Sequence, residues 1–549
     1  MKWYQPNSFL RGPDWRYSAM SVQIVMALFH TGADKVTNRR NFLAMLMGVL
    51  PAWAVSAHAT SLSDRPSSAE LAADPLRPQY HLLPPANWMN DPNGPVYWNG
   101  KYHMFYQYNP EGAYWGDMHW GHAVSPDMVH WRHLPIALSP TPGGPDSAGC
   151  FTGTAAVQNG RVVMMYTGVR AVPLDQATIK DGHPPLLESQ CLAIADNPEL
   201  KTWTKVPTPV IAAPPRRLQV NGFRDPSPWR QGDWWYTVIA TGIANQGGAV
   251  LLYRSKDLRV WDYMHILSRR DRSGLAGLDP FDPWEVWECP EFFPLGDRHI
   301  LIFSTAGKTF WQSGKLDEAA MTFHPEHAGI VDYGAYYAAK TQLDKAGNRI
   351  LWGWIQETRP LAEYKDAGWA GMMSLPRVLS LARDGSLRFS VAPEVNNLRG
   401  SERSLVIAVD DEQNRKQIES LRVEACCGEI LCAVKKAGKP FELVLSDPGG
   451  NADPWLSLGY DSNRPEQVFI DARPIPTVLD EGENIEFHLY VDSSVIEVLV
   501  NHQTAYTKRF YYSGKRPQNL HLRWNGSTAN IARLSVWQLK PISRDRLTT

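Results

Sequence analysis

Cysteine is scarce in this chain, which has six cysteines among 549 residues. The six lack the paired spacing with histidine or with each other that marks a zinc site, and they are too few for a disulfide scaffold of this length. We therefore expect no metal cluster, and we expect buried thiols with at most one bridge.

An excess of charge of one sign is also missing. The 55 lysine and arginine residues nearly balance the 56 aspartate and glutamate residues, which gives a formal net charge of −1. No block of like charge is available to attract a phosphate backbone or an anionic membrane surface. We therefore expect no nucleic-acid partner.

Long hydrophobic runs are absent apart from an apolar stretch at 42–57, which is shorter than the roughly 20 residues that span a bilayer. A twin arginine, Arg39-Arg40, precedes this stretch, and Ala57-His58-Ala59 follows it as a small-x-small cleavage pattern. The segment resembles a twin-arginine export signal. We expect residues 1–59 to be an N-terminal extension with a signal peptide, and the mature protein to be secreted or periplasmic without stable membrane insertion. An uncleaved anchor is the alternative.

Aromatic and turn-forming residues are abundant, with 22 tryptophans, 42 prolines and 41 glycines. This composition favours a turn-rich β architecture, and its aromatic faces are suited to packing on sugar rings. The length predicts two domains, or one large all-β domain with an appendage.

Short runs with a period of two extend from about residue 80 to 390, and turn residues separate them. Within them a strand, an acidic turn and a tryptophan recur about every 60 to 70 residues, ending at Trp131, Trp203 and Trp261. This weak repeat predicts a β-propeller, in which the first strand of each blade lines a central channel and distant residues converge at one end. We place the propeller at 77–392.

The pattern changes after Pro376-Arg377. Alternating runs at 486–492 and 495–500 are typical of sandwich strands. We expect a β-sandwich at 400–542, with a role in covering a propeller face or in a dimer contact.

Three acidic residues stand in turns of the propeller region. Cleavage of a glycosidic bond needs two carboxyl groups, so acids at strand ends are the candidates. Asp91 lies in a turn with Asp-Pro and Asn-Gly steps, Asp225 follows Arg224, which would keep it ionised, and Glu288 precedes Cys289-Pro290. Taken singly, these acids also fit a turn former, a surface ion pair and a solvated loop glutamate.

Together the three motifs, WMNDPNG at 88–94, RDP at 224–226 and ECP at 288–290, closely resemble the family 32 glycoside hydrolases. That family includes invertases, inulinases, levanases and fructan exohydrolases. The resemblance extends to FYQYNP at 105–110 and to the sandwich segments 489–492 and 495–497. It runs from about residue 77 to 537.

The resemblance implies an all-β fold, a five-bladed β-propeller followed by a C-terminal β-sandwich. It implies that Asp91 attacks the anomeric carbon, Glu288 serves as acid and base, and Asp225 stabilises the transition state. The reaction would proceed with retention, with the two reacting carboxyls about 5 to 5.5 Å apart. No metal or organic cofactor is implied, and Cys289 is expected to pack or tune its neighbours without forming covalent bonds.

The resemblance also implies a sugar pocket. Its expected lining, by match to the family motifs, consists of Asn90, Gln107, Trp115, Trp120, Phe151, Thr152, Arg224 and Trp354, with Asp332 and Tyr333 at the rim. For each tryptophan, packing in the core is the alternative.

The implied activity is release of terminal β-D-fructofuranosyl residues from sucrose, fructans or both. The segment 303–311 lacks a counterpart to the Asp and Lys pair with which plant invertases orient sucrose, so the leaving group can be glucose or fructose. The alternatives are a fructan exohydrolase acting on inulin or levan, a fructosyltransferase, a non-catalytic fructan-binding protein and an inverting arabinan hydrolase. The sugar is the expected partner, with a homodimer possible.

Overall fold

The structure, a computed structural model, describes residues 65–270 and 285–549, apart from short gaps at 406, 408, 436–439, 448–453, 480–482 and 513–518. Residues 66–549 form one compact unit. The expected export signal lies outside the described residues.

Five antiparallel sheets make up the first part of this unit. The first three contain, in order, β1 (Asn87–Trp98), β2 (Lys101–Asn109), β3 (His119–Ser125) and β4 (Arg132–Leu138); β5 (Cys150–Gln158), β6 (Arg161–Ala171), β7 (Leu186–Ala195) and β8 (Trp203–Lys205); and β9 (Val220–Gln231), β10 (Trp234–Ile243), β11 (Gly247–Ser255) and β12 (Trp261–Arg269).

The fourth sheet contains β13 (Glu288–Leu295), β14 (Arg298–Thr305), β15 (Lys308–Asp317) and β16 (Thr322–Asp332). The fifth contains β17 (Tyr336–Leu343), β18 (Arg349–Ile355), β20 (Met372–Met373), β21 (Arg377–Leu381) and β22 (Leu387–Val391). A short strand, β19 (Trp369–Ala370), pairs in parallel with β1.

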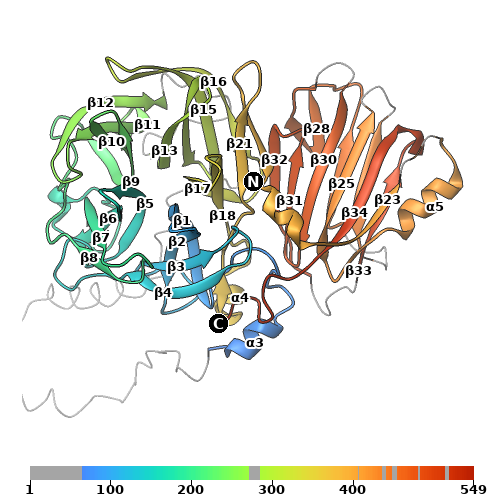
Figure 1. Ribbon diagram of the computed structural model, residues 1–549, viewed down its shortest axis with the longest axis horizontal. Coiled ribbons are helices and arrows are strands. Elements are labelled where there is room, and N and C mark those ends of the chain that lie inside the picture. Colours follow the sequence, from blue (N-terminus) through green and yellow to red (C-terminus); the bar gives the residue numbers. More distant parts are fainter. Residues whose placement is uncertain are drawn as a thin grey trace, which may run out of the picture. The chain divides into compact units, whose positions relative to one another are not determined.

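The first strands of the five sheets contact one another in a closed ring, from β1 through β5, β9 and β13 to β17 and back to β1. Figure 1 shows these five strands at the centre and β4, β8, β12 and β16 on the outside. The predicted five-bladed propeller is confirmed.

The weak sequence repeat is the turn between the third and fourth strands of a blade. In three blades this turn contains a residue with positive φ. The carbonyl oxygen of this residue accepts a hydrogen bond from the indole N–H of the tryptophan three residues later. The bonds run from Trp131 to Met128 at 3.0 Å, from Trp203 to Leu200 at 3.1 Å and from Trp261 to Leu258 at 3.0 Å.

The second part is a sandwich of two six-stranded sheets, and apolar side chains from both sheets form its core. One sheet has the order β23 (Arg399–Leu405), β34 (Ile531–Leu539), β25 (Cys427–Lys435), β30 (Asn484–Asp492), β31 (Val495–Val500) and β32 (Thr504–Arg509). The other has the order β24 (Arg422–Glu424), β33 (Asn519–Asn525), β26 (Phe441–Ser446), β27 (Leu456–Tyr460), β28 (Gln467–Ile470) and β29 (Arg473–Pro476).

Helices are few and short in the described residues. They are α3 (Ser68–Ala73), α4 (Leu361–Asp366) and α5 (Glu412–Ser420), with 3-10 turns at Leu174–Gln176, Pro393–Leu398 and Thr528–Asn530. A capping box between Ser67 and Glu70 starts α3. None of the described helices has the length and apolar character to cross a membrane.

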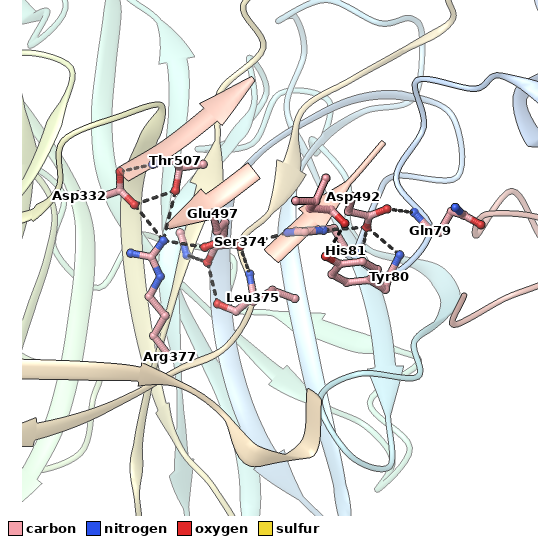
Figure 2. A network of polar contacts seen from close by, with 12 residues as sticks. Gln79, Tyr80, His81, Asp332, Ser374, Leu375, Arg377, Asp492, Glu497 and Thr507 are labelled. Atoms are coloured by element: carbon pink, nitrogen blue, oxygen red, sulfur yellow. Dashed lines mark hydrogen bonds and ion pairs between the residues drawn. The ribbon is translucent and has the colours of Figure 1, made fainter. Parts of the chain in front are cut away.

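A buried charge network joins the propeller to the sandwich (Figure 2). His81 contacts Asp492 at 2.9 Å and Glu497 at 3.1 Å, and both acids belong to the sandwich. Arg377 then bridges Glu497 at 2.6 Å and Asp332 at 2.8 Å. The side chains of all five residues are fully buried, so the two parts share a desolvated polar contact.

This network corrects the expectation that Asp332 binds sugar at the pocket rim. The Asp332 side chain is 0% exposed, and its oxygens accept bonds from the backbone and hydroxyl of Thr507, from Gly334 N–H and from Arg377. Tyr333 packs against the sandwich core, and its backbone N–H donates to Ala505 O. Both residues therefore serve the contact between the two parts.

None of the six cysteines forms a disulfide bond, and all six are buried. The single bridge that the sequence left open is not present. In the part of the chain that the structure describes, no group of three or more histidine, cysteine, aspartate or glutamate side chains is placed to hold a metal ion.

Candidate active site

Each of the five innermost strands has a register shift near its start. The shifts fall between Met89 and Pro92 in β1, Phe151 and Gly153 in β5, Arg224 and Ser227 in β9, Glu288 and Glu291 in β13, and Tyr337 and Lys340 in β17. A β-bulge bends the strand and re-aims its side chains. The three acidic motifs coincide with three of these shifts, which explains how they turn toward a common axis.

Asp91 is the acid most tightly held by neutral donors. The Thr152 hydroxyl donates to Oδ2 at 2.6 Å, and the Asn90 amide donates to Oδ1 at 3.0 Å. Asn90 is in turn fixed by the Trp88 indole at 2.7 Å. Burial raises the pKa of Asp91, while the Thr152 and Asn90 bonds oppose the rise and the charge of Glu288 adds to it.

Glu288 lies between a cation and a phenol. Arg224 donates to Oε1 at 2.7 Å, and the Tyr337 hydroxyl donates to Oε2 at 2.5 Å. Its side chain is 29% exposed, whereas the side chain of Asp225 is only 4% exposed. Glu288 is therefore more accessible than Asp225 for proton exchange with a leaving group or with water.

Arg224 is itself held from the second blade. Glu188 on β7 is fully buried and accepts from the Arg224 guanidinium at 2.9 Å and from the Phe223 N–H at 2.6 Å. Glu188 thus orients the arginine toward Glu288, 64 residues further along the chain.

The position of the Arg224 guanidinium relative to Asp225 differs from the one that the sequence predicted. The guanidinium of Arg224 comes no closer than 4.0 Å, because it points to Glu188 and Glu288. Burial raises the pKa of Asp225 to about 7, Arg224 opposes the rise, and the charges of Asp91 and Glu288 add to it. The charge of Arg224 therefore favours the ionised form of Asp225, as expected, but the two side chains do not form a close ion pair.

The backbone of the ECP motif at 288–290 donates the close hydrogen bond to Asp225 that Arg224 does not. The Cys289 N–H donates to Asp225 Oδ2 at 2.8 Å, and Cys289 has a positive φ of 51° that turns this N–H toward the acid. The Cys289 thiol lies 3.4 Å from Asp91 Oδ2. Burial raises the pKa of this thiol well above its usual range, which agrees with a role in packing and hydrogen bonding.

Aromatic side chains stand beside the acids. Trp88 and Trp354 meet edge to face at 5.9 Å, and Trp115 and Phe151 do so at 5.8 Å. One apolar cluster contains Trp88 and Trp354, with Trp115, Phe151 and Tyr337 packed against it. The expected sugar-binding residues Trp115, Phe151 and Trp354 are thus brought together.

Two expected sugar ligands lie deeper. Trp120 is 0% exposed and donates to Phe151 O at 3.0 Å, which is at odds with direct contact to a sugar. Gln107 is 2% exposed and donates to Cys150 O at 2.9 Å. Both side chains support the backbone that presents Phe151 and Thr152.

Tyr337 and Glu188 were not found among the expected site residues. Tyr337 begins the register shift in the fifth innermost strand, as Glu288 does in the fourth, so blade periodicity was an available signal. Glu188 carries no such signal, because it lies on β7, the third strand of its blade and not the innermost one.

Comparison with known families decides the assignment. The model described as the N-terminal domain of glycosyl hydrolases family 32 matches residues 81–390, and the model of the C-terminal domain of this family matches 394–538. The chain belongs to glycosyl hydrolase family 32. It is accordingly a glycosidase.

Relatives of this family 32 glycosidase include two from Escherichia coli. A sucrose-6-phosphate hydrolase is 32% identical over 84% of this chain and 94% of its own length, and a raffinose invertase is 37% identical over 84% and 95%. An acid β-fructofuranosidase of Phaseolus vulgaris is 31% identical over 84% and 80%.

Solved structures resemble the family 32 glycosidase over most of its length. A Bombyx mori β-fructofuranosidase is 27% identical with a TM-score of 0.70, covering 86% of this chain and 96% of its own. Fructan 1-exohydrolase IIa from Cichorium intybus is 26% identical with a TM-score of 0.71, covering 85% and 98%.

Proposed function

We propose that this glycosidase is a retaining β-fructofuranosidase that releases terminal β-D-fructofuranosyl residues from sucrose, fructans or both. The observation that carries the proposal is the contrast between two carboxyl groups at one site. Asp91 accepts bonds from two neutral donors, the hydroxyl of Thr152 and the amide of Asn90, while Glu288 lies between the Arg224 guanidinium and the Tyr337 hydroxyl. These environments suit a nucleophile and a proton carrier.

In the first step, Asp91 Oδ attacks the anomeric carbon and Glu288 gives its proton to the departing oxygen. The bond between the anomeric carbon and that oxygen breaks, and a fructosyl ester of Asp91 forms. In the second step, Glu288 takes a proton from water, whose oxygen attacks the same carbon and releases Asp91. Two inversions give net retention.

Asp225 would act on the sugar hydroxyls and on the developing charge of the ring. Its depth in the site and its bond from the Cys289 N–H fix its orientation before substrate arrives. The binding of a cationic transition state favours the ionised carboxylate, which offsets the rise in the pKa of Asp225 that burial causes.

The leaving group is the open part of the proposal. Lys308, in the segment where plant invertases carry their sucrose-orienting pair, donates to Tyr333 O at 3.0 Å and so is already engaged. Relatives are named for sucrose-6-phosphate, raffinose and fructan substrates. We therefore propose activity on both small fructosides and fructans.

The test is release of fructose by the purified protein from sucrose, sucrose 6-phosphate, raffinose, inulin and levan. Glu288→Gln and Asp91→Asn should each lower kcat by at least about 1,000-fold, because each removes one of the two reacting carboxyls. Glu318→Gln, at an exposed glutamate, is the matched control. Wild-type release equal to that of both active-site variants on every substrate would refute the proposal and favour a sugar-binding protein.

Product analysis separates the remaining chemistries. Methanolysis should give the β-anomer of methyl fructofuranoside, as retention requires, whereas an inverting enzyme gives the other anomer. At high sucrose, oligosaccharides in place of free fructose would assign a fructosyltransferase.

We further propose that the protein is exported by its twin-arginine-like signal to the periplasm or the medium. The support is the sequence Arg39-Arg40, the apolar stretch after it and the Ala57-His58-Ala59 pattern. The mass of the mature protein in a bacterial host should indicate cleavage near residue 59 in the wild type but not in Arg39→Lys/Arg40→Lys.

We also propose that the protein forms a homodimer through the sandwich. Sedimentation of the mature protein tests this proposal.

A further inference from the structure

A second polar layer lies two or three residues further along the innermost strands than the catalytic groups. Thr154 is two residues after Thr152 in β5, and Ser227 is two residues after Asp225 in β9. In β13 the spacing from Glu288 to Glu291 is three, because the bulge adds one residue. The bulge in β17 likewise separates Tyr337 from Lys340.

Glu291 is the centre of this layer. Its Oε1 accepts from Ser227 at 2.8 Å, from Lys340 at 3.1 Å and from Thr154 at 3.3 Å. Its Oε2 accepts from the hydroxyl of Thr341 at 2.7 Å and from the N–H of the same residue at 3.1 Å. One carboxylate therefore joins four of the five blades on the propeller axis.

The layer is fully enclosed. Glu291 is 3% exposed and Lys340 is 0% exposed. Desolvation of such a pair is costly, and a pair of this kind is weak evidence for stability. Five donors to one carboxylate offset that cost, and their arrangement indicates a need for a fixed geometry at this level.

The layer reaches the catalytic motif through the backbone. Lys340 also donates to Pro290 O at 3.4 Å. Pro290 directly follows Cys289, whose N–H binds Asp225, and Glu288 directly precedes Cys289. A shift of Lys340 would therefore move two of the three catalytic carboxyls relative to each other.

The layer also supplies charge. Lys340 favours the ionised form of Asp225, in opposition to Asp91 and Glu288, which disfavour it. With three carboxyl groups at one site, a fixed cation beneath them reduces the mutual repulsion of the ionised forms.

We propose that Glu291 and Lys340 are a positioning pair for this reaction, which sets the geometry of the catalytic carboxyls. The inference rests on the proposed function and deepens it, because neither residue touches the sugar. The charged and titratable groups that face the site from the packed strands are Asp91, Glu188, Arg224, Asp225, Glu288, Cys289, Glu291, Tyr337, Lys340 and Arg349.

The test compares Lys340→Met, Glu291→Gln and the double variant by pH profiles of kcat and kcat/KM. Removal of the cation should move the acid limb of kcat/KM to higher pH by about one unit, because Asp225 then ionises less readily. Removal of the anion should move the limb to lower pH. The double variant should return it close to the wild-type position.

All three variants should lower kcat about 10-fold or more with little change in KM, because the sugar contacts stay in place. Glu291→Gln keeps the shape and several acceptor bonds of the native side chain, so it remains informative if Lys340→Met does not fold. A merely structural pair would change stability and leave both limbs in place, and that result would overturn the inference.

A readout without turnover keeps the two proposals separate. Titration of 13C-carboxyl aspartate signals, assigned with Asp91→Asn and Asp225→Asn, should show the same opposite shifts in the two single variants. Inactive wild-type protein with these shifts would refute the proposed function alone. Active wild-type protein without them would refute the positioning pair alone.

Discussion

The hydroxyl of Tyr337 donates to Oε2 of Glu288 at 2.5 Å, on the carboxylate oxygen opposite the one that Arg224 binds. The two donors come from different blades, β17 and β9, so the orientation of the proton carrier depends on closure of the propeller ring. Burial raises the pKa of the Tyr337 phenol well above its usual range, which keeps it a donor throughout the working pH range.

Tyr337→Phe should lower kcat about 10-fold. The variant removes one of the two donors that hold the carboxylate of Glu288 in place. Tyr336→Phe is the matched control, since the neighbouring side chain is buried away from Glu288 and packs on Arg377. An equal kcat for the wild type and Tyr337→Phe would contradict the assignment.

Thr152→Val should move the acid limb of kcat/KM to higher pH. The Thr152 hydroxyl lowers the pKa of Asp91, so its loss raises that pKa, and the nucleophile must be ionised to react. We expect a shift of about one unit with the shape of the site retained. Thr237→Val is the control, because Thr237 is buried and bonds only a backbone carbonyl; an equal shift there would remove the specific explanation.

Cys289 should resist alkylation in the native protein. Its thiol is 2% exposed, and burial raises its pKa, so almost no thiolate is present near neutral pH. Iodoacetamide at pH 7.5 should leave both mass and activity unchanged over hours, while the unfolded chain is alkylated. Rapid stoichiometric labelling of Cys289 with loss of activity would show that the thiol is reactive.

Thermal stability should peak between about pH 4.5 and 6.5 as far as the network between the two parts contributes. Burial alone would lower the pKa of His81, but Asp492 and Glu497 raise it to about 9 from 6.5, so its stabilisation is complete below 6.5 and is lost as pH rises through 9. Burial would raise the pKa of Glu497, but Arg377 and His81 lower it to about 2 from 4.5, so its contribution is lost as pH falls below 4.5.

Calorimetry of the wild type and His81→Gln checks the alkaline side. The wild type should lose about 3 kcal/mol of this contribution between pH 6.5 and 9, and the variant should lack that dependence. His130→Gln, at an exposed histidine, is the control. Arg377→Met should cost about 3 to 5 kcal/mol at pH 6, because it leaves Glu497 and Asp332 without their shared cation; a loss under 1 kcal/mol would contradict this account of the contact.

The sequence by itself determined the class of fold and the identity of the acids. Turn-forming steps, period-two runs and the recurring tryptophan turn are local features, since Trp131 bonds a carbonyl only three residues away. The ordered motifs around Asp91, Asp225 and Glu288 were enough to indicate the family, because each motif lies within a few residues of chain.

Only the tertiary structure decided the hydrogen-bond partners, the burial and the pKa of each acid. The partners of Glu288 are 64 and 49 residues away, and Asp332 is bound to Thr507 across 175 residues. Sequence proximity placed Arg224 beside Asp225, but the fold directs its guanidinium to Glu188 and Glu288. Burial and long-range pairing set the pKa values of the acids and decide which donors bind them. Both depend on how distant strands meet in space, and no local pattern of residues contains that information.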